Sequence, residues 1–124
     1  PRIVASVYEN VDRDVYDLRL AACDAIALPF SGHTMLGTGT TSDLVAAGIP
    51  GLMSDWPYLA EHLEGLGIAM GVTVDDWAAA IDSLTPEALA EAAAYAPELQ
   101  ARYDPARIGL ATAIAIEALG VQRA

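Results

Sequence analysis

The chain has 124 residues, and 54% of them are hydrophobic, which suits one domain with ample material for a core. Its formal net charge of −11 reflects 17 acidic residues against six arginines and no lysine, a balance that repels phosphate backbones and anionic lipid surfaces. This composition argues against nucleic-acid binding, and the sequence has no run of roughly 18 apolar residues that would predict an integral membrane segment.

The N-terminal residues do not have the pattern of a secretory signal. Residues 1–4 lack its basic stretch and long apolar run, and they lack an initiator methionine. We therefore expect a cytoplasmic protein and a chain that was cut from a longer one. A single cysteine, Cys23, excludes an internal disulfide, and its apolar neighbours predict a buried, reduced thiol.

The first half of the chain alternates between strand and helix patterns. Residues 2–8 form a β-branched run typical of a strand, and residues 12–23 place apolar side chains at helical spacing. Residues 24–30 are a continuous apolar run, as expected of a parallel strand that is covered on both faces. A loop rich in glycine and threonine follows at residues 31–41 and leads into a short helix at residues 42–47.

The second half continues the alternation and then becomes helical. A strand, a helix and a strand are predicted at residues 49–54, 57–66 and 67–71. Three further helices are predicted at residues 75–84, 86–95 and 105–119. Thr85 and Asp104 support these boundaries, because each precedes a proline at the first helical position. Asp12 and Gly48 are placed to cap the start of the first helix and the end of the second.

Strands that alternate with helices predict βαβ units, right-handed crossovers and a parallel sheet. The sequence predicts four strands, followed by three helices, whereas a complete doubly wound domain has roughly five or six strands. We therefore expect residues 1–124 to form a single, partial α/β domain, Rossmann-like, with helices flanking the sheet. Its open sheet edges would be buried against the missing part of its own chain or against another copy.

The loop and helix at residues 31–47 are the first candidate site, since ligands bind at the carboxyl ends of parallel strands. Glycine lets backbone N–H groups approach a ligand, threonine adds hydroxyl donors, and a helix N-terminus adds partial positive charge. Together they predict a cradle for an anion such as the diphosphate of a nucleotide sugar. The candidate ligand-binding residues are His33, Gly37, Thr38, Gly39, Thr40, Thr41 and Asp43.

Several of these residues also have a plain structural interpretation. The loop could be an ordinary connection before a capped helix. The Asp43 carboxylate could accept two hydrogen bonds from a ribose diol, or it could be a first-turn acid that complements the helix dipole. The aromatic residues near the strand ends and helices are expected to be packing residues rather than platforms for a sugar: Trp56, Tyr58 and Trp77.

Residues 42–50, Ser-Asp-Leu-Val-Ala-Ala-Gly-Ile-Pro, resemble the acidic helix of GT-B type glycosyltransferases, above all retaining members similar to glycosyltransferase family 4. In that family a glutamate is followed five residues later by glycine and seven later by proline, and Asp43, Gly48 and Pro50 keep this spacing. Two other segments resemble the surroundings of that helix, residues 23–31 and 54–68. The resemblance extends over roughly residues 2–85.

The resemblance implies the C-terminal, nucleotide-sugar-binding domain of a glycosyltransferase that needs no cofactor and works with the rest of its chain. Asp43 would bind the ribose, the backbone of residues 37–41 would hold the diphosphate and the sugar, and residues 8–11 would lie near the base. Retaining members carry a glutamate eight residues before the ribose acid, and Met35 stands there in this chain. His33 could contact the donor instead, but a solvent-facing histidine in the loop is the simpler interpretation, and no catalytic residue is assigned.

Two other functions remain open. Pro1 permits an N-terminal-proline tautomerase, in which the proline amine acts as a base beside a β-α-β pattern. Alternatively, the chain is a non-catalytic half-domain that binds a nucleotide or a protein partner. A metal site is not predicted, because His33, His62 and Cys23 lack the spacing of metal ligands.

Overall fold

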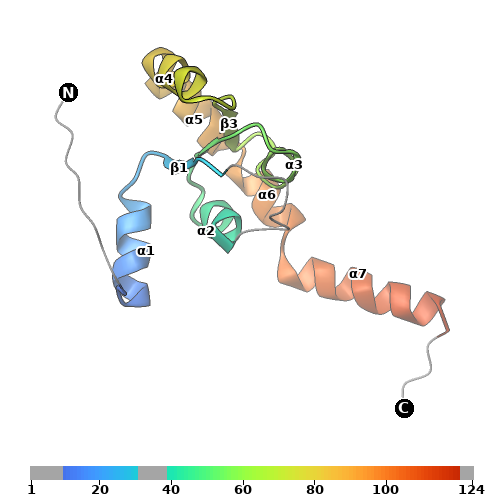
Figure 1. The fold of residues 1–124 in the computed structure, drawn as a ribbon. Coiled ribbons are helices and arrows are strands. Elements are labelled where there is room, and N and C mark those ends of the chain that lie inside the picture. The colour runs from blue at the N-terminus through green and yellow to red at the C-terminus, as the bar shows by residue number, and fades with distance from the viewer. Residues whose placement is uncertain (1–9, 31–38, 121–124) are drawn as a thin grey trace.

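The computed structural model of the chain describes residues 10–30 and 39–120 (Figure 1). Within these ranges three strands form one parallel sheet in sequential order. The strands are β1 (Ile26–Leu28), β2 (Gly51–Met53) and β3 (Gly67–Ala69). The predicted α/β class and parallel sheet are therefore confirmed, whereas the strand expected at residues 2–8 lies outside the described residues.

Seven helices accompany the sheet in the part of the chain that the structure describes. They are α1 (Arg13–Ala21), α2 (Gly39–Ala47), α3 (Pro57–His62), α4 (Val74–Ser83), α5 (Pro86–Ala94), α6 (Ala96–Arg102) and α7 (Pro105–Ala118). Six of them correspond to predicted helices, most with slightly different ends. The exception is α6, which Tyr95 separates from α5 and which has a proline near its start.

Helix α2 begins three residues earlier than the sequence predicts. Gly39, Thr40 and Thr41 therefore lie in its first turn and not in a loop, which corrects the predicted boundary at Ser42. Glycine and threonine are poor helix formers, but Thr41 is only 3% exposed. Packing of this turn against the core outweighs the weak local preference.

The predicted caps are confirmed at three of the four positions. The side chains of Thr85 and Asp104 each accept a hydrogen bond from a backbone N–H group in the first turn of α5 and α7. Gly48 ends α2 with a φ of 70°, a conformation that glycine adopts without steric cost. Asp12 stands at the N-cap position of α1, as predicted, but its side chain makes no capping hydrogen bond.

One face of the sheet carries the core. Leu44 of α2 and Leu63, which follows α3, pack over β2, and Gly51 gives them room, because a Cβ added there would lie 3.0 Å from a Leu63 methyl. Right-handed crossovers between neighbouring strands place α2 and α3 on this same face. The core cluster consists of Leu20, Leu28, Leu44, Val45, Ile49, Met53, Leu59, Leu63, Leu66, Ala96 and Leu99.

The opposite face of the sheet is less covered. Ala27, Leu52 and Ile68 are neighbours across the three strands and point to this face, since side chains alternate along a strand. Ala27 is exposed, and the other two are only half-buried. Parallel sheets are normally covered on both faces. The expectation of a strand covered on both sides is thus not met for β1 among the described residues.

Cys23 corrects another expectation, because its side chain is exposed and not buried. Helix α1 ends before this residue, so Cys23 lies in the turn that leads to β1 and points away from the core. Its Sγ donates a hydrogen bond to the carbonyl oxygen of Arg19 at 3.2 Å. The thiol therefore packs against the end of its own helix.

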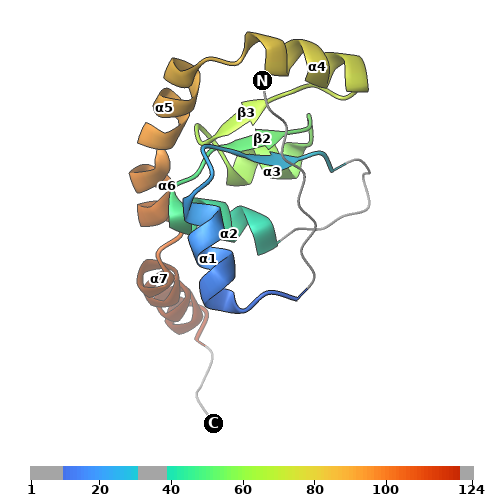
Figure 2. The ribbon, with the colours of Figure 1, turned by 90° about the vertical axis from the view of Figure 1, so that its left-hand side faces the viewer.

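Helix α7 stands apart from the rest of the fold. It extends away from the sheet and from the other helices, as Figure 1 shows, and Figure 2 views it nearly end-on. Although most of its side chains are apolar, none of its residues is buried. Among the described residues, no helix combines the length and the apolar character that a membrane-spanning segment requires.

Candidate functional site

The start of α2 lies at the edge of the sheet where parallel α/β folds bind ligands. Because α2 connects β1 to its parallel neighbour β2, it must run back against the strand direction. Its N-terminus is therefore on the side to which β1 leads, as Figure 2 shows. This is the carboxyl edge of the sheet, where the sequence places the candidate site.

Four of the seven candidate residues fall within the described ranges, and three do not. His33, Gly37 and Thr38 lie outside the described residues. Gly39 is exposed, with no heavy atom within 4 Å of a Cβ built on it, so the backbone there is open to a ligand. The buried Thr41 hydroxyl lies 3.4 Å from the Tyr58 hydroxyl, which turns it toward the protein.

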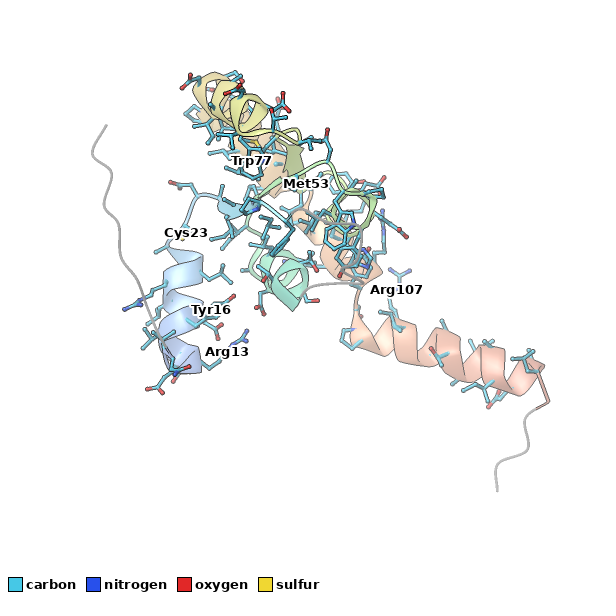
Figure 3. All side chains as sticks on the ribbon, viewed as in Figure 1. Arg13, Tyr16, Cys23, Met53, Trp77 and Arg107 are labelled. Atoms are coloured by element: carbon cyan, nitrogen blue, oxygen red, sulfur yellow. The ribbon has the colours of Figure 1, made fainter. Side chains whose placement is uncertain are left out.

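Asp43 lies one turn into α2 and is held by two side chains from α1. Arg13 donates a hydrogen bond from Nη2 to Asp43 Oδ1 at 3.1 Å, and Tyr16 donates one from Oη to Oδ2 at 3.0 Å. Figure 3 shows both donors on the side of α1 that faces α2. The side chain of Asp43 remains 26% exposed. We call Arg13, Tyr16 and Asp43 the Asp43 cluster.

The electrostatics of this cluster keep its two donors protonated. The hydrogen bond to Asp43, supported by a second one to Asp17, raises the pKa of Arg13 above its ordinary value. Partial burial raises the pKa of Tyr16, and its hydrogen bond to Asp43 adds to that effect. Near neutral pH Arg13 is therefore a cation and Tyr16 a phenol, and both donate hydrogen bonds to Asp43.

The structure brings together residues that sequence reasoning could not link. Arg13 and Tyr16 are separated from Asp43 by 30 and 27 positions, and no motif connects them. Their spacing of three residues places them on the same face of α1, which is a signal that a helical wheel could have given. The choice of Asp43 as their partner depends on how α1 packs beside α2.

A pocket of about 580 Å³ lies on a different side of α2 from the Asp43 cluster. Its volume is within the range of small-molecule sites, and apolar atoms make up most of its wall. Asp43 is not part of its lining. The pocket is lined by Thr41, Ser42, Val45, Ala46, His62, Gln100, Tyr103, Asp104, Pro105 and Ile108.

Polar groups in this pocket already serve the fold. Gln100 donates from Nε2 to the carbonyl oxygens of Val45 and Ala46, at 3.0 and 3.3 Å, and so satisfies the last turn of α2. Asp104 caps α7, as predicted. These contacts explain Gln100 and Asp104 without a ligand.

A row of rings leads from the start of α3 to the pocket. Trp56 and Tyr58 have centroids 4.9 Å apart, Tyr58 and His62 are 4.0 Å apart, and His62 and Tyr103 are 6.1 Å apart with nearly parallel planes. Trp56, Tyr58 and Tyr103 pack against the core cluster. The prediction that Trp56 and Tyr58 are packing residues is therefore confirmed.

Neither a metal centre nor a relative identifies the site. Within residues 10–30 and 39–120, no three His, Cys, Asp or Glu side chains are grouped so that they could hold a metal ion. Comparison of the chain with protein-family models, with curated proteins and with solved structures finds no match.

Proposed function

We propose that the chain is the donor-binding part of a cytoplasmic GT-B type glycosyltransferase, which transfers a sugar from a nucleotide-diphosphate sugar to an acceptor. The observation that supports this proposal most is the Asp43 cluster. It combines a partly exposed carboxylate and an arginine on neighbouring helices, close to the helix N-terminus at the carboxyl edge of a parallel sheet. A sugar nucleotide carries the complementary groups, a ribose diol and a diphosphate.

Asp43 can still accept hydrogen bonds from a ribose although two protein donors bind it. A carboxylate offers about four lone-pair positions, and the contacts to Arg13 and Tyr16 use one on each oxygen. The remaining exposure of the side chain lets a diol approach. In this arrangement Arg13 and Tyr16 orient the carboxylate, which lowers the entropy cost of binding the ribose.

The charge of the chain restricts how an anionic donor can be held. Lysine is absent, so a diphosphate must be bound by backbone N–H groups, by arginine or by a metal. The N-terminus of α2 supplies the positive end of the helix dipole, which favours an anion beside the first backbone N–H groups of the helix. Those groups and Arg13 would stabilise the departing diphosphate electrostatically, and the rest of the site would come from outside this chain.

Calorimetric titration of the chain with UDP, GDP, ADP and UDP-glucose tests the proposal. We expect at least one of these nucleotides to bind, and Asp43→Asn to weaken that binding by about tenfold or more, because hydrogen bonds to a charged group are lost. Asp75→Asn, at the exposed start of α4, is the matched control and should bind like the wild type. Absence of binding by every nucleotide, or equal loss in both variants, would contradict the proposal.

A separate observation favours the alternative function of a protein-binding half-domain. Apolar side chains are exposed on α7, and the second face of the sheet is incompletely covered. Such surfaces usually mark contacts with another protein segment. The other alternative, a tautomerase, depends on Pro1, which lies outside the described residues.

A further inference from the structure

Helix α7 is an apolar helix with no buried residue, although Pro105 and Ile108 near its start line the pocket beside α2 and α6. Its 14 residues extend away from the sheet (Figure 1). The side chains of Leu110 and Ile114 are 64% and 58% exposed. Exposed apolar side chains occur on more than one side of this helix, a pattern typical of buried helices. An isolated helix of this length is only marginally stable in water, so a contact along its length would stabilise it.

One face of α7 has a symmetric sequence. Leu110 and Ile114 are four residues apart and therefore adjacent on the helix surface. Arg107 precedes Leu110 by three residues, and Glu117 follows Ile114 by three, so the face reads Arg, Leu, Ile, Glu with its centre at position 112. An antiparallel copy of the helix, centred at the same position, would place Arg107 opposite Glu117 and Leu110 opposite Ile114 of the other copy.

We propose that α7 pairs with α7 of a second copy of the chain, as an antiparallel helix pair about a two-fold axis. In this arrangement Leu110 packs against Ile114 of the second copy, and Arg107 faces Glu117 of the second copy. Symmetry repeats both contacts, as in any two-fold interface. A single register thus matches apolar with apolar side chains and positive with negative charge.

The charge distribution favours this partner and this direction. The whole chain carries −11, but the only charged residues in α7 are Arg107 and Glu117, so α7 is a neutral surface on an acidic protein. Two acidic bodies repel each other over short distances. An antiparallel pair places them at opposite ends of helices about 21 Å long, well beyond the screening length of about 8 Å at physiological salt.

The contact between the two copies of α7 is small, so the dimer should be weak. One helix face buries less surface than the roughly 800 Å² per partner of a standard stable interface. We therefore expect a weak dimer that forms and dissociates with concentration. This proposal is independent of the donor site, because α7 does not contribute to the Asp43 cluster.

Sedimentation velocity over a concentration series tests the pairing on the full chain. The wild type should show a monomer–dimer equilibrium, and Ile114→Glu should weaken it by about tenfold or more, because a carboxylate would face an apolar side chain. The matched control is Ile116→Glu, the same substitution about 160° around the helix at a residue that is 43% exposed. It should dimerise like the wild type, and circular dichroism should show all variants folded.

Arg107 also has a structural contact, because its Nη1 donates to the carbonyl oxygen of Ala101 at 2.9 Å. Exchanging the charges of Arg107 and Glu117 distinguishes the proposed ion pair from this structural role. Arg107→Glu should weaken the dimer by a factor of about three to ten, since like charges would face each other. Adding Glu117→Arg should restore the wild-type affinity. A merely structural role of Arg107 would leave the double variant as weak as the single one.

Two results would overturn the pairing. The first is a wild-type chain that stays monomeric up to millimolar concentration. The second is equal loss of the dimer in Ile114→Glu and Ile116→Glu, which would place the contact on another face of α7 or elsewhere on the molecule.

Discussion

At the scale of single residues, Asp43 has a structural role beside its proposed one. Its carboxylate links α1 to α2 through hydrogen bonds from Arg13 and Tyr16. The link spans 27 or more positions of the chain, so it restrains the packing of two helices and not only a local turn. These contacts with α1 keep the Asp43 carboxylate in one orientation before a ligand binds.

We predict that Tyr16→Phe destabilises the fold by about 1 kcal/mol, because it removes one hydrogen bond to a partly buried carboxylate. Urea unfolding followed by circular dichroism measures the change. The matched control is Tyr95→Phe, which removes a hydrogen bond from a tyrosine to the exposed Glu98, three residues away. That local contact should matter less, and an equal or larger loss in Tyr95→Phe would contradict the structural role of the Asp43 cluster.

The sequence predicted correctly those features that depend on interactions between neighbouring residues. Thr85 and Asp104 cap helices through atoms two or three residues away, and the sequence alone indicates both. The partners of Asp43 and the exposure of Cys23 depend on how separate elements meet or on where a helix ends, and no neighbouring residue encodes that. His33 lies outside the described residues, so its role stays a prediction.

At the scale of elements, the helix boundaries follow from caps and glycines more than from apolar spacing. Helix α4 begins with a capping box, in which Asp76 N–H donates to Thr73 Oγ1 and the Asp76 carboxylate accepts from the backbone N–H groups of Thr73 and Val72. Helix α6 was not predicted. Tyr95 alone separates it from α5, and a break of one residue is too short to indicate a new helix from the sequence.

The capping box predicts an acid-sensitive start of α4. Hydrogen bonds from the Thr73 backbone, the Thr73 side chain and the Val72 backbone lower the pKa of Asp76 below its ordinary value of 3.8. A lowered folded-state pKa stabilises the helix fully above pH 3.8, and this contribution disappears as the pH falls through the lower folded value. Amide exchange measured by NMR should show the first turn of α4 opening in that acidic range.

In Asp76→Asn, the first turn of α4 should exchange faster at neutral pH and should lose this pH dependence. If the wild type and Asp76→Asn respond to acid in the same way, the carboxylate is not what holds the turn.

Replacing Gly65 and Gly109 by alanine should change stability in opposite directions. Gly65 has a φ of 76°, and a Cβ added there would collide with the ring of Tyr95, so Gly65→Ala should destabilise the fold by about 2 kcal/mol or more. Gly109 lies within α7 with no heavy atom near such a Cβ, so Gly109→Ala should stabilise that helix by about 0.5–1 kcal/mol. Thermal unfolding measures the first effect, and helical circular dichroism measures the second.

At the scale of the whole molecule, the core lies between α2, α3 and one face of a small sheet, and α7 extends away from it. The three strands and their parallel pairing were predictable, because alternating strand and helix patterns imply βαβ units, whereas the strand order is known from the structure alone. The pocket was not predictable, because its lining comes from four separate helices. The exposed α7 and the thinly covered second face of the sheet indicate that further contacts complete this fold.

The measurement that tests the donor site most directly is an NMR titration of the isotope-labelled chain with the nucleotides used for calorimetry. We predict that the backbone amide signals of Gly39, Thr40 and Asp43 shift with the nucleotide concentration, together with the side-chain signal of Arg13. Signals from α7 should stay unchanged at a fixed protein concentration. Shifts confined to the pocket beside α6 and α7, or no shifts with any nucleotide, would contradict a donor site at the start of α2.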